Sequence, residues 1–320
     1  VFSAGFRYQE IEFQGRSTVN SGVTGFAYDT AHPIYNVIDE NTAYNLGLEK
    51  KIDPFTNIFV RYSKGFRTPN IDERIKATTS GSFALKDQTS EDIELGVRAE
   101  RNKTNLVASI FLMDTEDEIQ YNQSVNTNLD PIERSGFNLD LNYQINDKHN
   151  LKAALSYINA EFTSGSLTPG SGGAGSCDYT NTTYCSNSST WQNLMGGGTS
   201  YSLSGKEVPL VAPLNYNIAI ESKINESTFF DVELEYTDEK YVSNDQENIE
   251  PKIPDYYILN TKLRSDYRGL DFTFGVNNLF DKDYYDFAVS STFHDDNHYG
   301  TRAVYPLSGR NIFFDLGYTF

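Results

Sequence analysis

Apolar and polar residues alternate along much of the chain with a period of two. In residues 229–236, Phe230, Val232, Leu234 and Tyr236 fall on one side and acidic residues lie between them. Alternation of this kind predicts a β-strand with one apolar and one polar face. No segment has a convincing 3.6-residue period, so the pattern predicts an all-β protein and leaves short helices in the connections undecided.

Twelve segments show this alternation or are bounded as strands. The predicted strands are residues 1–13, 41–51, 56–64, 90–101, 104–121, 135–146, 149–162, 214–225, 228–242, 256–267, 269–280 and 311–320. Most are ten or more residues long, which is the length that crosses a bilayer when the strand is tilted. A soluble β-sandwich is the alternative, but its strands are commonly about 5–6 residues long.

The connections between these strands alternate between tight and long without exception. The tight connections are 52–55, 102–103, 146–149, 225–227 and 266–268. The long ones are 14–40, 65–89, 122–134, 163–213, 243–255 and 281–310. In an up-and-down antiparallel sheet, every second connection lies at the same end. We therefore expect all long loops at one rim, away from Phe320, as in outer-membrane barrels with short periplasmic turns.

The chemistry of the two faces predicts which one meets lipid. Hydrocarbon does not solvate carboxylates, so the apolar face points outward and the polar face lines the lumen. The residues expected on the inner face are Arg61, Asp92, Glu94, Arg98, Asp140, Lys152, Glu221, Asp231, Glu233, Glu235, Asp271 and Asp315. Such a lumen is either full of water or in contact with a polar plug.

Composition agrees with a membrane barrel and excludes some other classes. The chain has 26 Lys and Arg against 44 Asp and Glu, a net charge of −18, which argues against nucleic-acid binding. Its mean hydropathy is −0.51, and it has no apolar run long enough for a membrane helix. Aromatic residues make up 14% of the chain and favour strands. The chain begins at Val1 inside an alternating segment, so we interpret it as part of a longer protein.

Four segments carry recognisable motifs in order along the chain. They are Tyr-Ser-Lys-Gly-Phe-Arg-Thr-Pro-Asn at 62–70 with Leu-Lys-Asp-Gln-Thr-Ser at 85–90, Gly-Lys-Glu-Val-Pro at 205–209, Gly-Val-Asn-Asn-Leu-Phe-Asp-Lys-Asp-Tyr-Tyr at 275–285, and Gly-Arg-Asn through Tyr-Thr-Phe at 309–320. Together they resemble the signatures of TonB-dependent outer-membrane receptors. Asp87 and Gln88 replace the Pro-Glu of that family, and no His lies between Phe66 and Leu85, where its haem receptors commonly carry one.

The resemblance implies a transmembrane antiparallel up-and-down β-barrel of 22 strands with an N-terminal plug, in the outer membrane of a Gram-negative bacterium. Residues 1–320 would then be the C-terminal portion of the barrel, about its last 12 strands, without the plug and the first strands. The implied partners are the TonB complex, acting through the missing N-terminal region, outer-membrane lipids, and a small-molecule or chelate ligand.

The two cysteines lie in the longest connection. Cys177 and Cys185 could bind a metal, but zinc sites usually need four ligands at close spacing. A disulfide that closes residues 178–184 is favoured, because exported loops are oxidised and the cysteine count is even.

The last long loop clusters His, Asp and Tyr residues that could contact a metal or a metal chelate. A solvated polar loop tip is the favoured interpretation of the same residues. The candidate ligand-binding residues in the long loops are Arg67, Trp191, His294, Asp295, Asp296, His298 and Tyr299. Capture by loops 65–89, 163–213 and 281–310 is expected, because loops that long are uncommon unless they bind something or are disordered.

The sequence favours transport over catalysis. Its four His, at 32, 149, 294 and 298, form no arguable triad, and we predict no catalytic residue, cofactor or bound metal. The first hypothesis is TonB-coupled import of a scarce solute: a ferric siderophore, cobalamin, another metal chelate or an oligosaccharide. A passive porin is the second hypothesis, and a barrel protease or lipase is the third.

Overall fold

The chain folds into one large antiparallel sheet. The computed structural model describes residues 1–15, 18–20, 26–28, 35–75, 85–122, 125–167, 201–243, 245–248, 250–290 and 302–318. The sheet has twelve strands in the order β1-β4-β5-β6-β7-β10-β11-β14-β15-β16-β17-β20, so each strand pairs with its neighbours along the chain. All twelve predicted strands are present, and the predicted all-β, up-and-down architecture is confirmed.

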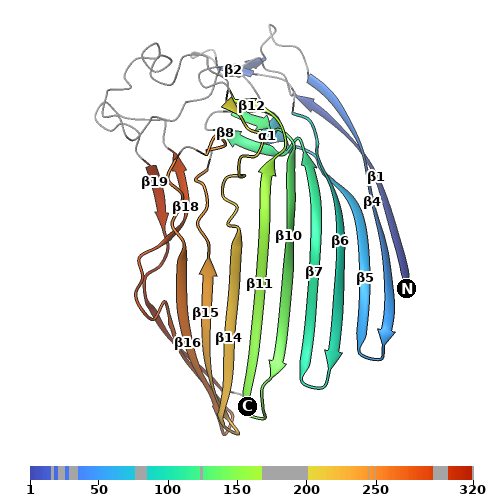
Figure 1. The fold of residues 1–320 in the computed structure, drawn as a ribbon. Helices are drawn as coiled ribbons and strands as arrows, with labels where there is room; N and C mark the ends of the chain where they lie inside the picture. Colours follow the sequence, from blue (N-terminus) through green and yellow to red (C-terminus); the bar gives the residue numbers. More distant parts are fainter. Residues whose placement is uncertain are drawn as a thin grey trace.

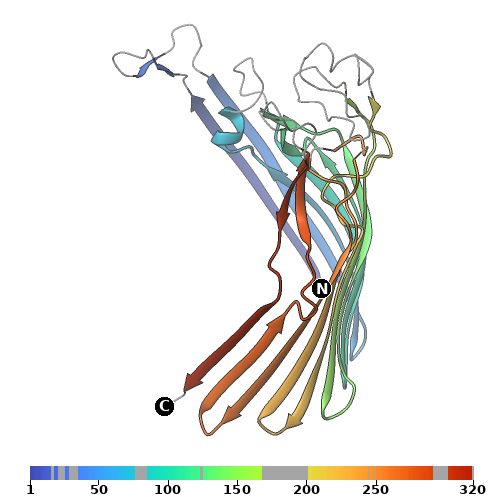
Figure 2. The same cartoon turned by 90° about the vertical axis from the view of Figure 1, so that its left-hand side faces the viewer.

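The strands of the main sheet are long. Their bounds are β1 Phe2–Gly15, β4 Tyr35–Asp53, β5 Thr56–Arg67, β6 Gln88–Arg101, β7 Thr104–Glu116, β10 Ile132–Gln144, β11 His149–Phe162, β14 Leu214–Asn225, β15 Thr228–Thr237, β16 Tyr256–Tyr267, β17 Leu270–Asn277 and β20 Asn311–Tyr318. The sheet curves into an open trough (Figure 2), with β1 and β20 at its edges. Within the described residues these two edge strands share no pairing, so this is part of a barrel rather than a small closed one.

Short strands and one short helix lie on the side of the sheet opposite the tight turns. They are β2 Thr18–Asn20 with β3 Phe26–Tyr28, β8 Ile119–Asn122 with β9 Val125–Asn128, β12 Ser166–Leu167 with β13 Tyr201–Ser202, β18 Tyr285–Ser290 with β19 Arg302–Pro306, and helix α1 Ile71–Ile75. The described ends of the long connections meet at this loop-side rim, and the tight turns lie at the other (Figure 1). The predicted asymmetry of the two rims is therefore confirmed.

Asparagine and aspartate side chains close the tight turns. Asn146 Oδ1 accepts hydrogen bonds from the backbone N–H groups of Lys148 and His149, at 2.8 and 3.0 Å. Asn225 Oδ1 accepts one from Ser227 N–H at 3.0 Å. At the turn after β6, Asn102 adopts a positive φ of 48°, a conformation that Asn tolerates better than most residues.

The strand register places the predicted polar residues on one face. Arg61 lies directly opposite Glu94, and Lys152 directly opposite Asn142, two positions along the strand from Asp140. The same parity runs through every pairing of the sheet, so all twelve residues expected in the lumen share a face. The other face exposes large apolar side chains, such as Ile110 at 59% and Leu95 at 52%. An exposed apolar surface of this extent is what a lipid-facing barrel wall requires.

Aromatic pairs mark the apolar face toward the loop-side rim. Tyr216 and Tyr236 are direct cross-strand partners with ring centroids 4.9 Å apart. Phe137 and Tyr157 pair in the same way at 5.7 Å. Aromatic side chains on the lipid-facing side are typical of membrane barrels.

Some predicted boundaries were wrong. The strand predicted at 104–121 ends at Glu116, because Asp117 takes a positive φ of 55° and the chain turns into the β8–β9 hairpin. The strand predicted at 228–242 ends at Thr237, and the one predicted at 269–280 ends at Asn277, before Asn278 at φ 51°. Positive φ interrupts the extended backbone, and an alternating pattern of side chains does not reveal it. In the part of the chain that the structure describes, no helix is long and apolar enough to cross a membrane.

Candidate ligand-binding surface at the loop-side rim

Arg67 ends β5 and stands at the mouth of the trough. Thr68 and Pro69 break the strand, and Asn70 then caps α1. Asn70 Oδ1 accepts from Glu73 N–H at 2.9 Å, and Asn70 N–H donates back to Glu73 Oε2 at 2.8 Å, which is a capping box. Arg67 pairs with Glu73, and its side chain is 46% exposed, so its charge is open to solvent but already partly balanced.

Arg74 fixes this helix to the wall of the trough. Its side chain is fully buried, pairs with Asp39 and lies 3.6 Å from Asp87. Its guanidinium also donates to Leu85 O at 3.2 Å and lies 4.8 Å from the centre of the Phe13 ring. The Asp87 carboxylate that joins this cluster stands where the family pattern has Pro. Both ends of the 65–89 loop are therefore attached to β1 and β4 at one point.

A second buried cluster lies beyond the ends of β14 and β15. Val242, Ile253 and Ala288 are buried together, with Leu210 and Tyr285 packed against them. This cluster joins the segment after β15 to the 203–213 segment and to the β18–β19 hairpin. The hairpin is also held by Asp286, which accepts hydrogen bonds from Lys240 at 2.7 Å and Tyr256 at 3.0 Å.

The same region buries carboxylates. Asp245, Glu247 and Glu250 are 2%, 8% and 5% exposed. Burial raises the pKa of Glu247 above its ordinary value, and the neighbouring charges of Asp245 and Glu250 raise it further, while Lys206 opposes them. The raised pKa links the stability of this connection to the protonation of Glu247.

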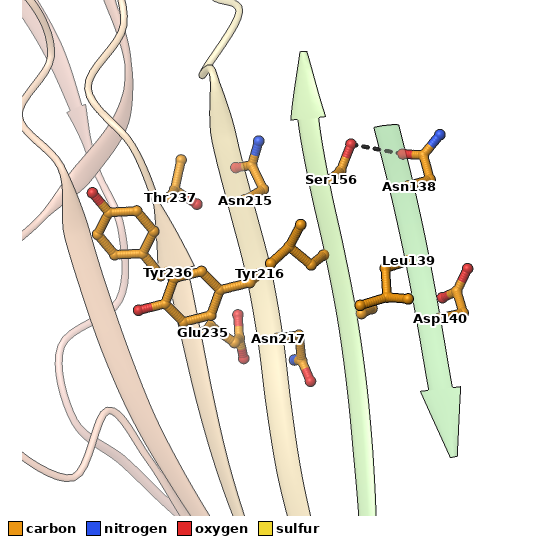
Figure 3. Close-up of a pocket in the computed structure, with 12 residues that line it drawn as sticks. Asn138, Leu139, Asp140, Ser156, Asn215, Tyr216, Asn217, Glu235, Tyr236 and Thr237 are labelled. Atoms are coloured by element: carbon orange, nitrogen blue, oxygen red, sulfur yellow. Dashed lines mark hydrogen bonds between the residues drawn. The ribbon is translucent and has the colours of Figure 1, made fainter. Parts of the chain in front are cut away.

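The wall of the trough holds a hollow of about 380 Å³ over β10, β11, β14 and β15 (Figure 3), lined by both apolar and polar groups. Asn138, Ser156, Asn215 and Asn217 place amides and hydroxyls along it, and Ser156 donates to Asn138 at 2.9 Å. Asn217 also donates to Glu233 at 2.6 Å. A surface of this kind can bind water or the polar groups of a solute or protein surface.

Ion pairs cross the strands of the polar face. Arg264 contacts Glu221 at 2.6 Å and Asp231 at 3.0 Å, so one guanidinium bridges β14, β15 and β16. Arg61 lies 3.3 Å from both Asp92 and Glu94. These pairs balance part of the negative charge of the wall and order its side chains.

Of the predicted binding residues, the structure describes Arg67 alone. The other six, and the predicted disulfide, lie outside the described residues: Trp191, His294, Asp295, Asp296, His298, Tyr299, Cys177 and Cys185. Among the residues that are described, no group of three or more His, Cys, Asp or Glu side chains could hold a metal ion.

The sequence analysis missed the residues that organise the rim. The Asn-x-x-Glu spacing at Asn70 and Glu73 is a helix-start signal that could have revealed α1. Nothing in the local pattern indicated the burial of Arg74, because its partner Asp39 lies 35 positions away and they meet only in the folded sheet.

Comparison of the chain with known proteins identifies one matching family model. The family model described as TonB dependent receptor-like, beta-barrel, matches residues 1–279. None of the curated proteins compared with the chain matches it.

Solved structures of longer chains share this fold. The siderophore receptor PiuA from Acinetobacter baumannii is 18% identical with a TM-score of 0.68, over 99% of this chain and 40% of that one. The closed form of the ferric-catecholate import receptor Fiu from E. coli K12 is 16% identical with a TM-score of 0.69, over 98% and 41%. The ferric yersiniabactin uptake receptor FyuA from Yersinia pestis is 14% identical with a TM-score of 0.69, over 100% and 43%. The chain thus spans about two fifths of the length of these structures.

Proposed function

Because the chain belongs to the TonB-dependent receptor family, we propose that it is the C-terminal part of a receptor that imports a scarce solute under TonB control. Receptors of this family are β-barrels of the Gram-negative outer membrane, and the chain is placed there. They are transport proteins rather than enzymes, and we propose no catalytic role for any residue of this chain.

The observation that carries the proposal is the family match over residues 1–279 on a sheet with a polar inner wall and long loops gathered at one rim. An open sheet exposes unpaired backbone groups at both edges, which a complete barrel would pair with further strands. We propose that such strands and a plug precede this chain, and that TonB acts through that part of the protein.

A ferric siderophore is the solute class that we propose first. PiuA, Fiu and FyuA are named for siderophore or ferric-chelate uptake, and they share the fold of this chain at low identity. Arg67 at the mouth offers a half-exposed cation. Capture is assigned to the loops that carry Arg67, Trp191 and the segment His294–Tyr299.

The passive channel remains the alternative function, and energy dependence separates the two. Cells that produce the complete receptor take up radiolabelled iron presented with a panel of siderophores. Import by the proposed mechanism stops when TonB is removed, although binding to intact cells continues. Uptake that continues without TonB would support a passive channel.

The capture loops are tested separately. Deleting residues 170–198, or replacing His294 and His298 by Ala, should weaken ferric-siderophore binding to whole cells at least tenfold while the barrel still folds, since no strand of the main sheet is changed. Glu226→Gln, in a tight turn at the opposite rim, is the control. Unchanged binding and growth on every siderophore after both alterations would refute capture by these loops and leave the family assignment intact.

A further inference from the structure

The side chain of Asn128 forms hydrogen bonds with both backbone groups of one residue in a neighbouring loop, as a paired β-strand does. Its Oδ1 accepts from Lys86 N–H at 2.9 Å, and its Nδ2 donates to Lys86 O at 3.0 Å. The same Nδ2 also donates to Asp117 O at 2.8 Å. One side-chain amide thus pairs both backbone groups of a residue 42 positions away and holds the end of its own hairpin.

Asn248 makes the same arrangement in another pair of loops. Its Oδ1 accepts from Glu207 N–H at 2.7 Å, and its Nδ2 donates to Glu207 O at 2.9 Å and to Asp245 O at 3.2 Å. The carboxylate of Glu207 also pairs with Lys252 at 3.1 Å. Both the backbone and the side chain of Glu207 therefore attach the 203–213 segment to the connection after β15.

Two further amide contacts join these pairs into a series. Asn126 Nδ2 donates to Glu73 O at 3.0 Å, so the β8–β9 hairpin contacts the middle of α1. Gln246 Nε2 donates to Gln120 Oε1 at 2.7 Å, which joins positions 126 residues apart. These two loops follow β7 and β15, which are separated by β10, β11 and β14 in the sheet, so the contact joins loops of non-adjacent strands.

We propose that these amides join four loop-side segments into one cooperative unit. The segments are 67–75 with 85–87, 117–122 with 125–128, 203–213 and 245–248. Asn126, Asn128 and Asn248 and the Gln120–Gln246 pair are its positioning residues. Loop backbone without a strand partner needs other hydrogen-bond partners, and these side chains supply them. Opening one segment removes the partners of the next, so the segments open together. This coupling does not depend on which solute the proposed receptor binds.

Hydrogen exchange followed by mass spectrometry tests the coupling in the protein isolated from outer membranes. Asn128→Ala removes three hydrogen bonds and should speed exchange about tenfold or more in peptides that carry 85–87 and 117–120. The decisive expectation is faster exchange also at 245–248, which Asn128 does not touch. Asn128→Asp keeps the size of the side chain and the Lys86 N–H bond but loses the donor, and should act in the same direction.

Asn159→Ala is the matched control, because Asn159 is exposed on β11 and its amide donates to Glu161 of the same strand. It should leave exchange at 85–87, 117–120 and 245–248 unchanged. If both Asn128 variants speed exchange next to position 128 and leave 245–248 at the native rate, the segments open independently and the proposal is wrong. Heat-modifiable gel migration verifies that each barrel is folded. If the Asn128→Ala barrel does not fold, the Asn128→Asp variant alone provides the test.

Discussion

At the scale of single residues, Arg74 is the residue on which the base of the 65–89 loop depends most. Its charged side chain is completely buried, and its charge is balanced by Asp39 and Asp87. Removing one partner of such a cluster leaves charge buried without compensation, which costs more than the intact cluster contributes. The cluster therefore acts mainly to fix where α1 and Arg67 lie.

Arg74→Met should lower the free energy that holds α1 closed by about 3–5 kcal/mol, because Asp39 and Asp87 then face each other without a cation. Hydrogen exchange of residues 68–75 measures this opening. The triple variant with Asp39→Asn and Asp87→Asn removes the like charges and should recover much of the loss. Native exchange in Arg74→Met would show that the buried ion pairs do not hold the helix.

We expect the stability of the loop that carries Glu247 to depend on pH. Burial raises the pKa of Glu247 in the folded loop above the ordinary value of 4.5. The folded loop therefore binds the proton more tightly than the open loop. The stability that this group contributes to the folded loop is greatest below pH 4.5 and is lost as the pH rises through the raised pKa.

Glu247→Gln should remove this pH dependence and slow the opening of residues 245–248 at neutral pH. Hydrogen exchange at several pH values, corrected for the intrinsic rate, measures the effect. Glu226→Gln at an exposed turn is the control and should keep the native profile. A native loop that opens more readily as the pH falls toward 4.5 would contradict this assignment.

At the scale of elements, side-chain alternation was sufficient to predict the main sheet. Each of the twelve long strands has a lipid-facing and a lumen-facing side, so its sequence carries the period of two. The hairpins β2–β3, β8–β9, β12–β13 and β18–β19 were missed because strands of two to six residues carry too little pattern. Helix α1 was missed although its capping spacing at Asn70 and Glu73 was local, whereas the loop contacts were missed because they depend on long-range partners such as Asp39 and Asn126.

Glycines permit close approach between particular strands. Gly96 and Gly275 each lie beneath the ring of their direct cross-strand partner, Phe59 and Phe313. Gly136 in β10 is tighter, because an added Cβ would lie 2.0 Å from the backbone oxygen of Tyr157. Backbone cannot move aside as a side-chain tip can, so β10 and β11 need Gly at this position.

Gly136→Ala should therefore destabilise the barrel by about 1–3 kcal/mol through strain between β10 and β11. Urea unfolding in lipid vesicles measures the change. Gly317→Ala in β20 is the matched control, because its nearest heavy atom would be 3.7 Å from the added Cβ. Equal stability of the two variants would show that the sheet relaxes around position 136.

At the scale of the whole molecule, the two faces of the sheet and its loop-side rim have different roles. The apolar face meets lipid, the charged face lines the lumen, and the loop-side rim carries the segments that we assign to capture. The sequence predicted the faces and rims because both follow from alternation and loop length. It did not predict the linkage of the rim, which depends on amide contacts between residues up to 126 positions apart.

The division of the faces is tested most directly by nitroxide scanning of β7 in lipid bilayers, with Cys177 and Cys185 replaced by Ser so that each label is unique. Collision rates with oxygen report lipid, and those with a water-soluble nickel chelate report the lumen. The lipid-facing positions are Leu106, Ala108, Ile110 and Leu112. We expect oxygen access to peak at these four and nickel access at the positions between them. A flat profile, or one with the opposite phase, would contradict the account.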